Sequence, residues 1–349
     1  DLNTQQAEKL NRQIKRQAIT LVKNENQLPL YGNDKVACLV IGEEKPNVFQ
    51  QTLARYYGVD NYNLGKSPTK KEITAMLGYL KLYSRVVIGV TNTNIVARKN
   101  FGFTDEGIDL AEQIALQNST SLVVFASPYS VSKVNKIEKF KAVVIAYQDD
   151  EETQLEAAQV LAGAYSPKGK LPVSISLAYT KGRGLTYKEE GKIALAHPLE
   201  LGFNVDKLKK VDALINAGLL EKAYPGCQVL VLKDGKLVYE NNAGYTDYTN
   251  NQKVTSESIY DLASLTKVLA TTLSAMKLYD MGLLDVNATL GSYLDFIPKN
   301  SPHATVTIKN AMLHQAGFPA WIPFYKAFIK DEETRNRYFS TTQTETNPW

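Results

Sequence analysis

Ser264 and Lys267 are the residues of this sequence whose types and spacing best fit covalent catalysis. A serine hydroxyl is a weak nucleophile and needs a base within hydrogen-bonding reach. A lysine three residues further along a helix lies on the same face as the serine, and burial favours its neutral form, which accepts a proton. At a helix N-terminus, the serine N–H also faces a developing oxyanion. The pair therefore predicts acyl transfer through a serine ester.

The Ser-x-x-Lys spacing alone does not identify a nucleophile, because it occurs three more times, at Ser67–Lys70, Ser130–Lys133 and Ser274–Lys277. Ser67 precedes a proline, and we interpret it as a helix cap. Ser130 follows a strand in a predicted loop, and Ser274 lies well inside a predicted helix. Ser264 differs because an extended segment there passes into a long apolar helix. The alternative for Ser264 is a helix cap.

Other groups with possible chemistry have simpler interpretations. The carboxylates Asp149–Asp150 and Glu151–Glu152 could serve as acid and base, but we interpret them as the solvated start of a helix, where the dipole favours negative charge. The three histidines lack metal-ligand spacing. Gly182-x-Gly184 does not open a helix after a strand, so it is not a dinucleotide fingerprint. We expect no metal and no cofactor.

Short apolar segments alternate with helical patterns in the first half of the chain. The strand-like segments are Val36–Gly42, Val59–Leu64, Arg85–Val90, Ser121–Ser127 and Ala142–Tyr147, and the helical patterns cover 4–18, 47–57, 69–82, 105–118 and 151–163. Most of these strands are apolar on both faces, which is typical of a parallel sheet. The alternation predicts an α/β fold with a doubly wound, mostly parallel sheet.

The pattern changes after a segment rich in proline and glycine. We expect a first domain over 1–180, a linker over 181–204 and a second domain over 205–349. The second domain opens with a helical pattern and a predicted β-hairpin whose turn is Asp234-Gly235. An apolar helix over about 264–281 follows, and it positions the serine and lysine described above.

Composition excludes several classes of protein. The 349 residues are 44% hydrophobic and 22% charged, which excludes collagen-like and wholly disordered chains. The net charge of +4 comes from interleaved basic and acidic residues, so we expect no nucleic-acid partner. No apolar segment approaches the roughly 20 residues of a membrane span. The chain starts without a methionine or a signal peptide, and we expect it to be a segment of a longer protein.

The second half resembles serine β-lactamase-like hydrolases, the group of class C β-lactamases, penicillin-binding proteins and esterases. The resemblance covers about 205–349 and rests on Pro225-Gly226-Cys227-Gln228-Val229, Lys233-Asp234-Gly235-Lys236, Ala243-Gly244, Ala263-Ser264-Leu265-Thr266-Lys267 and Leu313-His314-Gln315-Ala316-Gly317-Phe318-Pro319. It implies that Ser264 is the acylated nucleophile and Lys267 its base.

The sequence also departs from that family. The family carries a Tyr-x-Asn or Tyr-x-Ser element and a later Lys-Thr-Gly or His-x-Gly strand, and the chain contains neither form of the strand motif. Tyr338-Phe339-Ser340 fits the tyrosine pattern, but it is close to the nucleophile in sequence and precedes a polar tail, so we reject it. We therefore expect only the N-terminal part of this fold, a partial α+β domain.

The first half resembles the C-terminal α/β sandwich of glycoside hydrolase family 3, over about 4–180. The resemblance rests on Ala18-Ile19-Thr20-Leu21-Val22-Lys23-Asn24, Leu28-Pro29-Leu30 and Gly169-Lys170-Leu171-Pro172-Val173-Ser174, and Ala126-Ser127-Pro128-Tyr129 and Ala146-Tyr147-Gln148-Asp149 are closer to the bacterial β-N-acetylglucosaminidase branch. It implies an upstream catalytic barrel domain in the same protein, which carries the glycosidase nucleophile and acid.

Together the two resemblances imply a segment of a bifunctional bacterial cell-envelope hydrolase, located in the periplasm or associated with the envelope. The implied substrates are cell-wall glycans for the glycosidase and acyl, D-alanyl or ester groups for the serine hydrolase. The alternative is a non-catalytic scaffold, in which the sandwich shapes the cleft of a partner domain and the serine domain is inactive.

Overall fold

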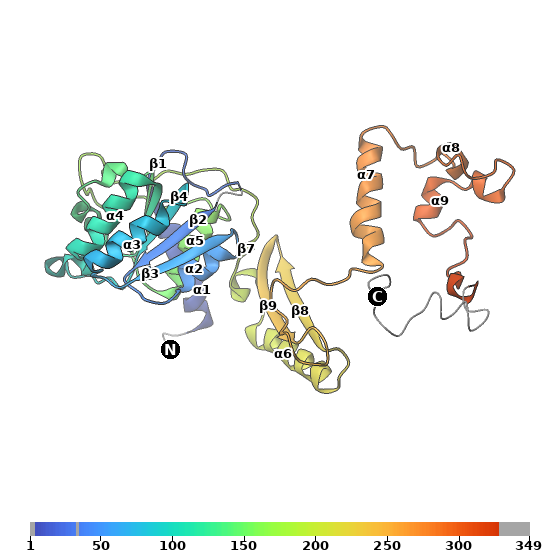
Figure 1. Cartoon of the computed structure of the whole chain (residues 1–349), viewed down its shortest axis with the longest axis horizontal. Coiled ribbons are helices and arrows are strands. Elements are labelled where there is room, and N and C mark those ends of the chain that lie inside the picture. The colour runs from blue at the N-terminus through green and yellow to red at the C-terminus, as the bar shows by residue number, and fades with distance from the viewer. Residues whose placement is uncertain (1–3, 33–34, 328–349) are drawn as a thin grey trace. The chain divides into compact units, whose positions relative to one another are not determined.

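The computed structural model describes residues 4–32 and 35–327. By its internal contacts the chain divides into two compact units, Asp1–Ser258 and Ile259–Trp349, which are described separately below (Figure 1). Within the described residues, no helix combines the length and apolar character that crossing a membrane requires.

A six-stranded sheet forms the centre of the first unit. Its strands are β1 (Thr20–Asn24), β2 (Val36–Ile41), β3 (Val59–Leu64), β4 (Arg85–Val90), β5 (Ser119–Val124) and β6 (Ala142–Ile145), in the order β1-β6-β5-β4-β2-β3. All neighbouring pairs are parallel except β1 with β6. The predicted fold class, a mostly parallel doubly wound sheet, is confirmed. β1 is not among the strands predicted from the sequence.

Helices cover both faces of this sheet (Figure 1). They are α1 (Gln5–Ala18), α2 (Val48–Ala54), α3 (Lys70–Leu80), α4 (Asp105–Gln117) and α5 (Glu151–Ala162). Hydrogen bonds from N-cap residues define where these helices begin. Thr69 and Glu72 form a capping box at α3, and Asp150 accepts a hydrogen bond from Thr153 N–H at the start of α5. The prediction that 149–152 begins a helix is therefore confirmed.

The core consists of two apolar layers, one on each face of the sheet. Alternate residues of one strand point to opposite faces, so Leu39 of β2 packs in the layer of α3 and α4, whereas Val40 packs in the layer of α2 and α5. Phe49 and Phe125 are fully buried in the second layer with their ring centroids 5.4 Å apart, in an edge-to-face arrangement. Burial on both faces explains the continuous apolar strands.

Gly169 is required by a close approach of the backbone. Its N–H donates to the carbonyl of Ile19 at 3.0 Å, and a Cβ at this position would lie 2.1 Å from the carbonyl oxygen of Ala18. We expect Gly169→Ala to lower the free energy of unfolding by about 1–3 kcal/mol, because the backbone must shift to relieve the clash. Urea denaturation measures this change.

Gly78 provides the matched control for that substitution. It lies inside α3, and a Cβ there would meet no atom within 4 Å. Gly78→Ala is expected to stabilise the protein by about 0.5–1 kcal/mol through helix propensity. Equal effects of the two substitutions would contradict the packing explanation for Gly169.

The first unit continues with a small second sheet. β7 (Ala194–Leu195) leads into a short 3₁₀ turn, Pro198–Leu201, followed by α6 (Val205–Leu220) and the hairpin of β8 (Gly226–Lys233) and β9 (Lys236–Gly244). The strand order is β7-β9-β8. The predicted hairpin with its Asp234-Gly235 turn is confirmed, and both turn residues have positive φ.

The second unit is helical over its described residues. A π-helical segment, Lys267–Thr272, continues into α7 (Leu273–Asp280), and α8 (Leu290–Tyr293) and α9 (Ile308–Met312) follow. Thr289 and Thr307 form an isolated antiparallel bridge between the segments that precede α8 and α9. The predicted helix over about 264–281 is thus present, with its first half widened into a π-helix.

Candidate functional site

Ser264 lies in the first turn of the helix that continues into α7. The carbonyl of Ser264 accepts from Lys267 N–H at 3.1 Å, and the carbonyl of Ala263 accepts from Thr266 N–H at 3.1 Å. Just before this turn, Asp261 Oδ1 accepts from Ala263 N–H at 2.8 Å. Ala263 has a φ of +43°, a left-handed conformation that is costly for a residue other than glycine. The turn therefore presents Ser264 at the start of a helix, after a strained residue.

The structure brings Ser264 and Lys267 together. Lys267 Nζ donates to Ser264 Oγ at a distance of 3.2 Å, across one turn of the helix. This is the contact through which a neutral amine would accept the hydroxyl proton. Both side chains are exposed, so water surrounds the lysine. Water stabilises the charged form of an amine, which disfavours its action as a base.

The three other Ser-x-x-Lys pairs have different surroundings. Ser130 is buried, and its hydroxyl donates to the carbonyl of Ser127 at 2.7 Å. Ser274 lies inside α7. The interpretation of Ser67 as a helix cap is wrong, because Thr69 caps α3. Of these four serines, Ser264 is the one whose hydroxyl accepts a hydrogen bond from the lysine three residues later.

His197 and the two cysteines, Cys38 and Cys227, have side chains that could do chemistry, but their contacts and burial are structural. His197 Nδ1 accepts from Leu199 N–H at 3.3 Å, which caps the 3₁₀ turn after β7. Cys38 is fully buried, and burial raises the pKa of its thiol, whereas Cys227 is half-buried. Within 4–32 and 35–327, no cluster of three or more His, Cys, Asp or Glu side chains could hold a metal ion. Tyr338-Phe339-Ser340 lies outside the described residues.

The carboxylates at the start of α5 line a crevice of about 610 Å³ beside the carboxyl ends of β2 and β4. Asp149 accepts from Thr93 N–H at 3.1 Å and from Gln154 Nε2 at 3.0 Å. Asp150 caps α5 and pairs with Lys15 Nζ at 2.8 Å. Burial alone would raise the pKa of Asp150, but hydrogen bonds to Lys15 and Thr153 outweigh it and lower the pKa. These contacts fix both carboxylates in structural roles.

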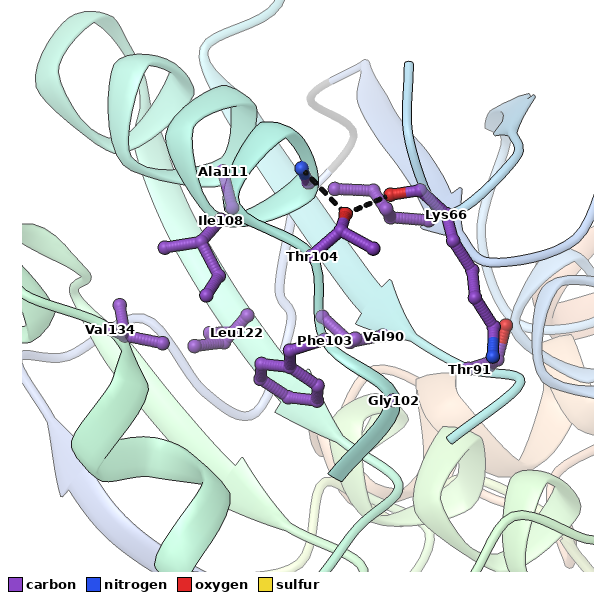
Figure 2. A pocket seen from close by; sticks show the side chains of 12 residues that line it. Lys66, Val90, Thr91, Gly102, Phe103, Thr104, Ile108, Ala111, Leu122 and Val134 are labelled. Atoms are coloured by element: carbon purple, nitrogen blue, oxygen red, sulfur yellow. Dashed lines mark hydrogen bonds between the residues drawn. The ribbon is translucent and has the colours of Figure 1, made fainter. Parts of the chain in front are cut away.

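A smaller cavity lies between the sheet and α4 (Figure 2). Its volume is about 20 Å³, enough for about one water molecule. Most of its lining is apolar, with Ile108, Leu122 and Val134 among the side chains, and Thr104 Oγ1 beside it joins Lys66 to α4 by donating to the Lys66 carbonyl and accepting from Gly107 N–H (Figure 2). The cavity is too small for a cell-wall substrate.

One buried polar network has no counterpart among the residues singled out from the sequence, and α1 supplies its Arg12 and Arg16. Arg16 forms ion pairs of 2.7 Å with Glu156 and 2.8 Å with Glu200, and Arg12 forms an ion pair of 2.8 Å with Glu156. The side chain of Glu156 is fully buried. The i, i+4 spacing of the two arginines places them on one helix face, but nothing in the sequence indicates their distant partners.

Comparison with family models matches both parts of the chain. Residues 19–206 match the glycosyl hydrolase family 3 C-terminal domain, and residues 211–346 match the beta-lactamase family. Both resemblances predicted from the sequence are confirmed.

Curated relatives match about a third of the chain. A putative D-alanyl-D-alanine carboxypeptidase of Escherichia coli is 32% identical over 136 residues, covering 35% of this chain and 31% of the relative. The corresponding protein of Salmonella typhimurium is 31% identical over 141 residues, covering 37% of this chain and 32% of the relative. The chain thus spans about a third of the length of these relatives.

Solved structures match about half of the chain. A glycoside hydrolase family 3 β-N-acetylglucosaminidase from a Paenibacillus species has 21% identity and a TM-score of 0.42, with 50% of this chain and 34% of that chain covered. A β-glucosidase from Listeria innocua has 16% identity and a TM-score of 0.41, with 50% of this chain and 27% of that chain covered.

The matched families account for the two parts of the structure. The mostly parallel sheet and helices α2 to α5 lie within the first match. Most of α6, the hairpin and the helix of Ser264 lie within the second. Both are families of hydrolases. The chain therefore belongs to the glycosyl hydrolase family 3 C-terminal domain family, and a beta-lactamase-like region follows that domain.

Proposed function

We propose that the beta-lactamase-like region, 205–349, supplies a serine hydrolase site in which Ser264 is the nucleophile and Lys267 the base. The observation that carries this proposal is the 3.2 Å hydrogen bond between Lys267 Nζ and Ser264 Oγ in the first turn of the helix. The family match over 211–346 supports it.

The proposed reaction has two steps. Ser264 Oγ attacks the substrate carbonyl carbon while neutral Lys267 accepts the hydroxyl proton, and the resulting oxyanion faces the N–H groups at the start of the helix. The C–N or C–O bond then breaks, and the leaving group takes the proton from Lys267. A water molecule attacks the serine ester in the second step, which releases the acid and restores the hydroxyl of Ser264.

The proposed substrates are D-alanyl peptides or esters of the bacterial cell wall. Curated relatives that match about a third of the chain are named as putative D-alanyl-D-alanine carboxypeptidases. Such a substrate places the protein in the periplasm or at the cell envelope. We base this location on the names of the curated relatives.

For the first part of the chain we propose the role of an auxiliary domain of a β-N-acetylglucosaminidase. In this proposal the sandwich, 1–180, joins through 181–204 to the serine hydrolase region and serves a glycosidase barrel domain upstream in the same protein. The barrel supplies the glycosidase nucleophile and acid. In support, Asp149 and Asp150 of the sandwich already hold structural hydrogen bonds and ion pairs.

The exposure of Ser264 and Lys267 favours a second candidate, a non-catalytic scaffold. Water favours the ammonium form of an exposed amine, which has no lone pair to accept the proton of a serine. In this case Ser264 would not be acylated, and the sandwich would shape the cleft of a partner domain.

A comparison of acylating probes tests the proposed substrate class. The chain is incubated with a penicillin, whose β-lactam mimics a D-alanyl-D-alanine peptide, and separately with an acyl ester, and adducts are followed by intact-protein mass spectrometry. We expect a slow 1:1 adduct with the penicillin, because the site is exposed. An adduct with the ester alone would contradict the D-alanyl assignment. Rapid stoichiometric acylation would show that the exposure of Ser264 and Lys267 does not slow the reaction.

A further inference from the structure

β7 is bonded on both sides, to the sandwich and to the hairpin. On the sandwich side, Leu195 N–H donates to Gln159 Oε1 of α5 at 2.6 Å. On the hairpin side, Ala194–Leu195 pairs in parallel with Lys236–Leu237 of β9, and Ala196 N–H donates to the carbonyl of Leu237 at 2.9 Å. A strand from the end of the first family match therefore completes the small sheet of the second.

The segment that follows β7 is fixed by Arg16. The guanidinium donates to both oxygens of Glu200, at 2.8 and 3.1 Å, and to both oxygens of Glu156, at 2.7 and 2.8 Å. Glu200 lies in the 3₁₀ turn directly after β7, whereas Glu156 lies on α5. Bidentate pairs of this kind combine strength with a defined geometry. Arg16 thus ties the end of β7 to the sandwich.

The segment before β7 is also bonded to the sandwich. Leu185 N–H donates to the carbonyl of Leu21 at 2.7 Å, and Glu190 N–H donates to the carbonyl of Gly163 at 3.0 Å. A flexible linker leaves such backbone groups to water. The segment predicted as a linker, 181–204, therefore contains ordered contacts on both sides of β7.

Two further contacts join the hairpin to the same surface. Arg55, the residue that caps the C-terminus of α2, forms an ion pair with Glu240 of β9, and Lys233 Nζ donates to the carbonyl of Leu201 at 2.8 Å. The hairpin in turn bonds to α6, since Asp212 Oδ1 accepts from Tyr239 Oη at 2.6 Å. α6, the hairpin and the sandwich are thus linked through β7 and its neighbours.

We propose that β7 couples the hairpin of the beta-lactamase-like region to the sandwich as one cooperative body, with the Arg16–Glu200 pair as its clamp. A two-stranded hairpin alone is at best marginally stable. Pairing with β7 gives β9 a second neighbour, and the clamp holds β7 in place. The orientation of α6 and the hairpin on the sandwich is therefore fixed, without a flexible tether.

Hydrogen exchange of the full chain, followed by mass spectrometry, tests this coupling in Glu200→Gln. This substitution keeps the shape of the side chain and removes its charge. We expect the amides of 194–196 and of β8 and β9 to exchange about 10-fold faster or more, because a charged hydrogen-bonded pair is lost. The amides of β4 and β5 should accelerate much less, because Glu156 keeps its ion pairs with Arg12 and Arg16 in this variant. Glu44→Gln, which alters an exposed glutamate in the loop after β2, is the control and should change neither group.

Two results would overturn the proposal. Unchanged exchange in β8 and β9 would show that the clamp does not hold the hairpin, and an equal increase in β4 and β5 would show a general loss of stability instead. Ala196→Pro provides a second variant, because it removes the N–H that bonds to β9 and leaves the clamp intact. It should accelerate exchange in the hairpin in the same way, and a wild-type rate there would also contradict the coupling.

Discussion

Replacing Ser264 with alanine is expected to abolish the adduct that a fluorophosphonate forms with this chain. The reagent phosphonylates a serine that a nearby base activates, and Lys267 Nζ lies 3.2 Å from Ser264 Oγ. Labelling of the unmodified chain should be slow, because both side chains are exposed. Intact-protein mass spectrometry over several hours measures the adduct as an added mass.

Ser274→Ala is the matched control for this prediction. Ser274 also precedes a lysine by three residues, but it lies inside α7, where its N–H is part of the helix. This variant should acquire the adduct at the rate of the unmodified chain. Loss of labelling in Ser274→Ala, or its persistence in Ser264→Ala, would refute the assignment of the nucleophile.

Replacing Arg16 with methionine is expected to lower the free energy of unfolding by about 3 kcal/mol. The substitution removes a cation from Glu156, whose side chain is fully buried, and from Glu200, whose side chain is 5% exposed. Arg12 still pairs with Glu156 at 2.8 Å and with Glu200 at 3.5 Å, but Glu200 loses its bidentate partner. Guanidinium denaturation at neutral pH measures the loss.

Arg98→Met is the control, because Arg98 is an exposed arginine in the 3₁₀ segment Ala97–Gly102 that follows β4. We expect it to change the free energy of unfolding by less than about 0.5 kcal/mol. If Arg16→Met has an equally small effect, the network does not stabilise the sandwich.

The same network predicts a dependence on pH. Burial raises the pKa of Glu200, but hydrogen bonds and the charge of Arg16 outweigh it, so the pKa lies below its ordinary value. A carboxylate with a lowered pKa contributes stability above its unfolded pKa of about 4.3 and loses that contribution as the pH falls through the folded pKa. The unmodified chain should therefore lose stability below about pH 4, and Arg16→Met should lose less over the same range.

The regular elements of the sandwich could be predicted because their signals are local. β2 and β4 are short apolar segments, buried on both faces, and Thr69 and Glu72 mark the start of α3 within four residues. β1 is not predictable from periodicity, although its sequence is part of a family motif. It is an edge strand that pairs antiparallel with β6, more than 100 residues away, and such a partner leaves no periodic signal.

The candidate site could be predicted in part for the same reason. Ser264 and Lys267 are three residues apart on one helix, so their contact follows from helix geometry. The positive φ of Ala263 and the π-helical turn have no sequence signal in this segment. β7 is only two residues long, and Glu200 meets Arg16 across 184 positions, so neither the strand nor the clamp could be found without the fold.

The central claim is that Ser264 is an acylated nucleophile, and peptide mapping of the fluorophosphonate adduct tests it most directly. The labelled, unmodified chain is digested, and fragmentation mass spectrometry locates the phosphonyl group. The account predicts that the group is on Ser264, in the peptide that precedes Lys267. A phosphonyl group on another serine, or a chain that remains unlabelled after prolonged exposure, would contradict it.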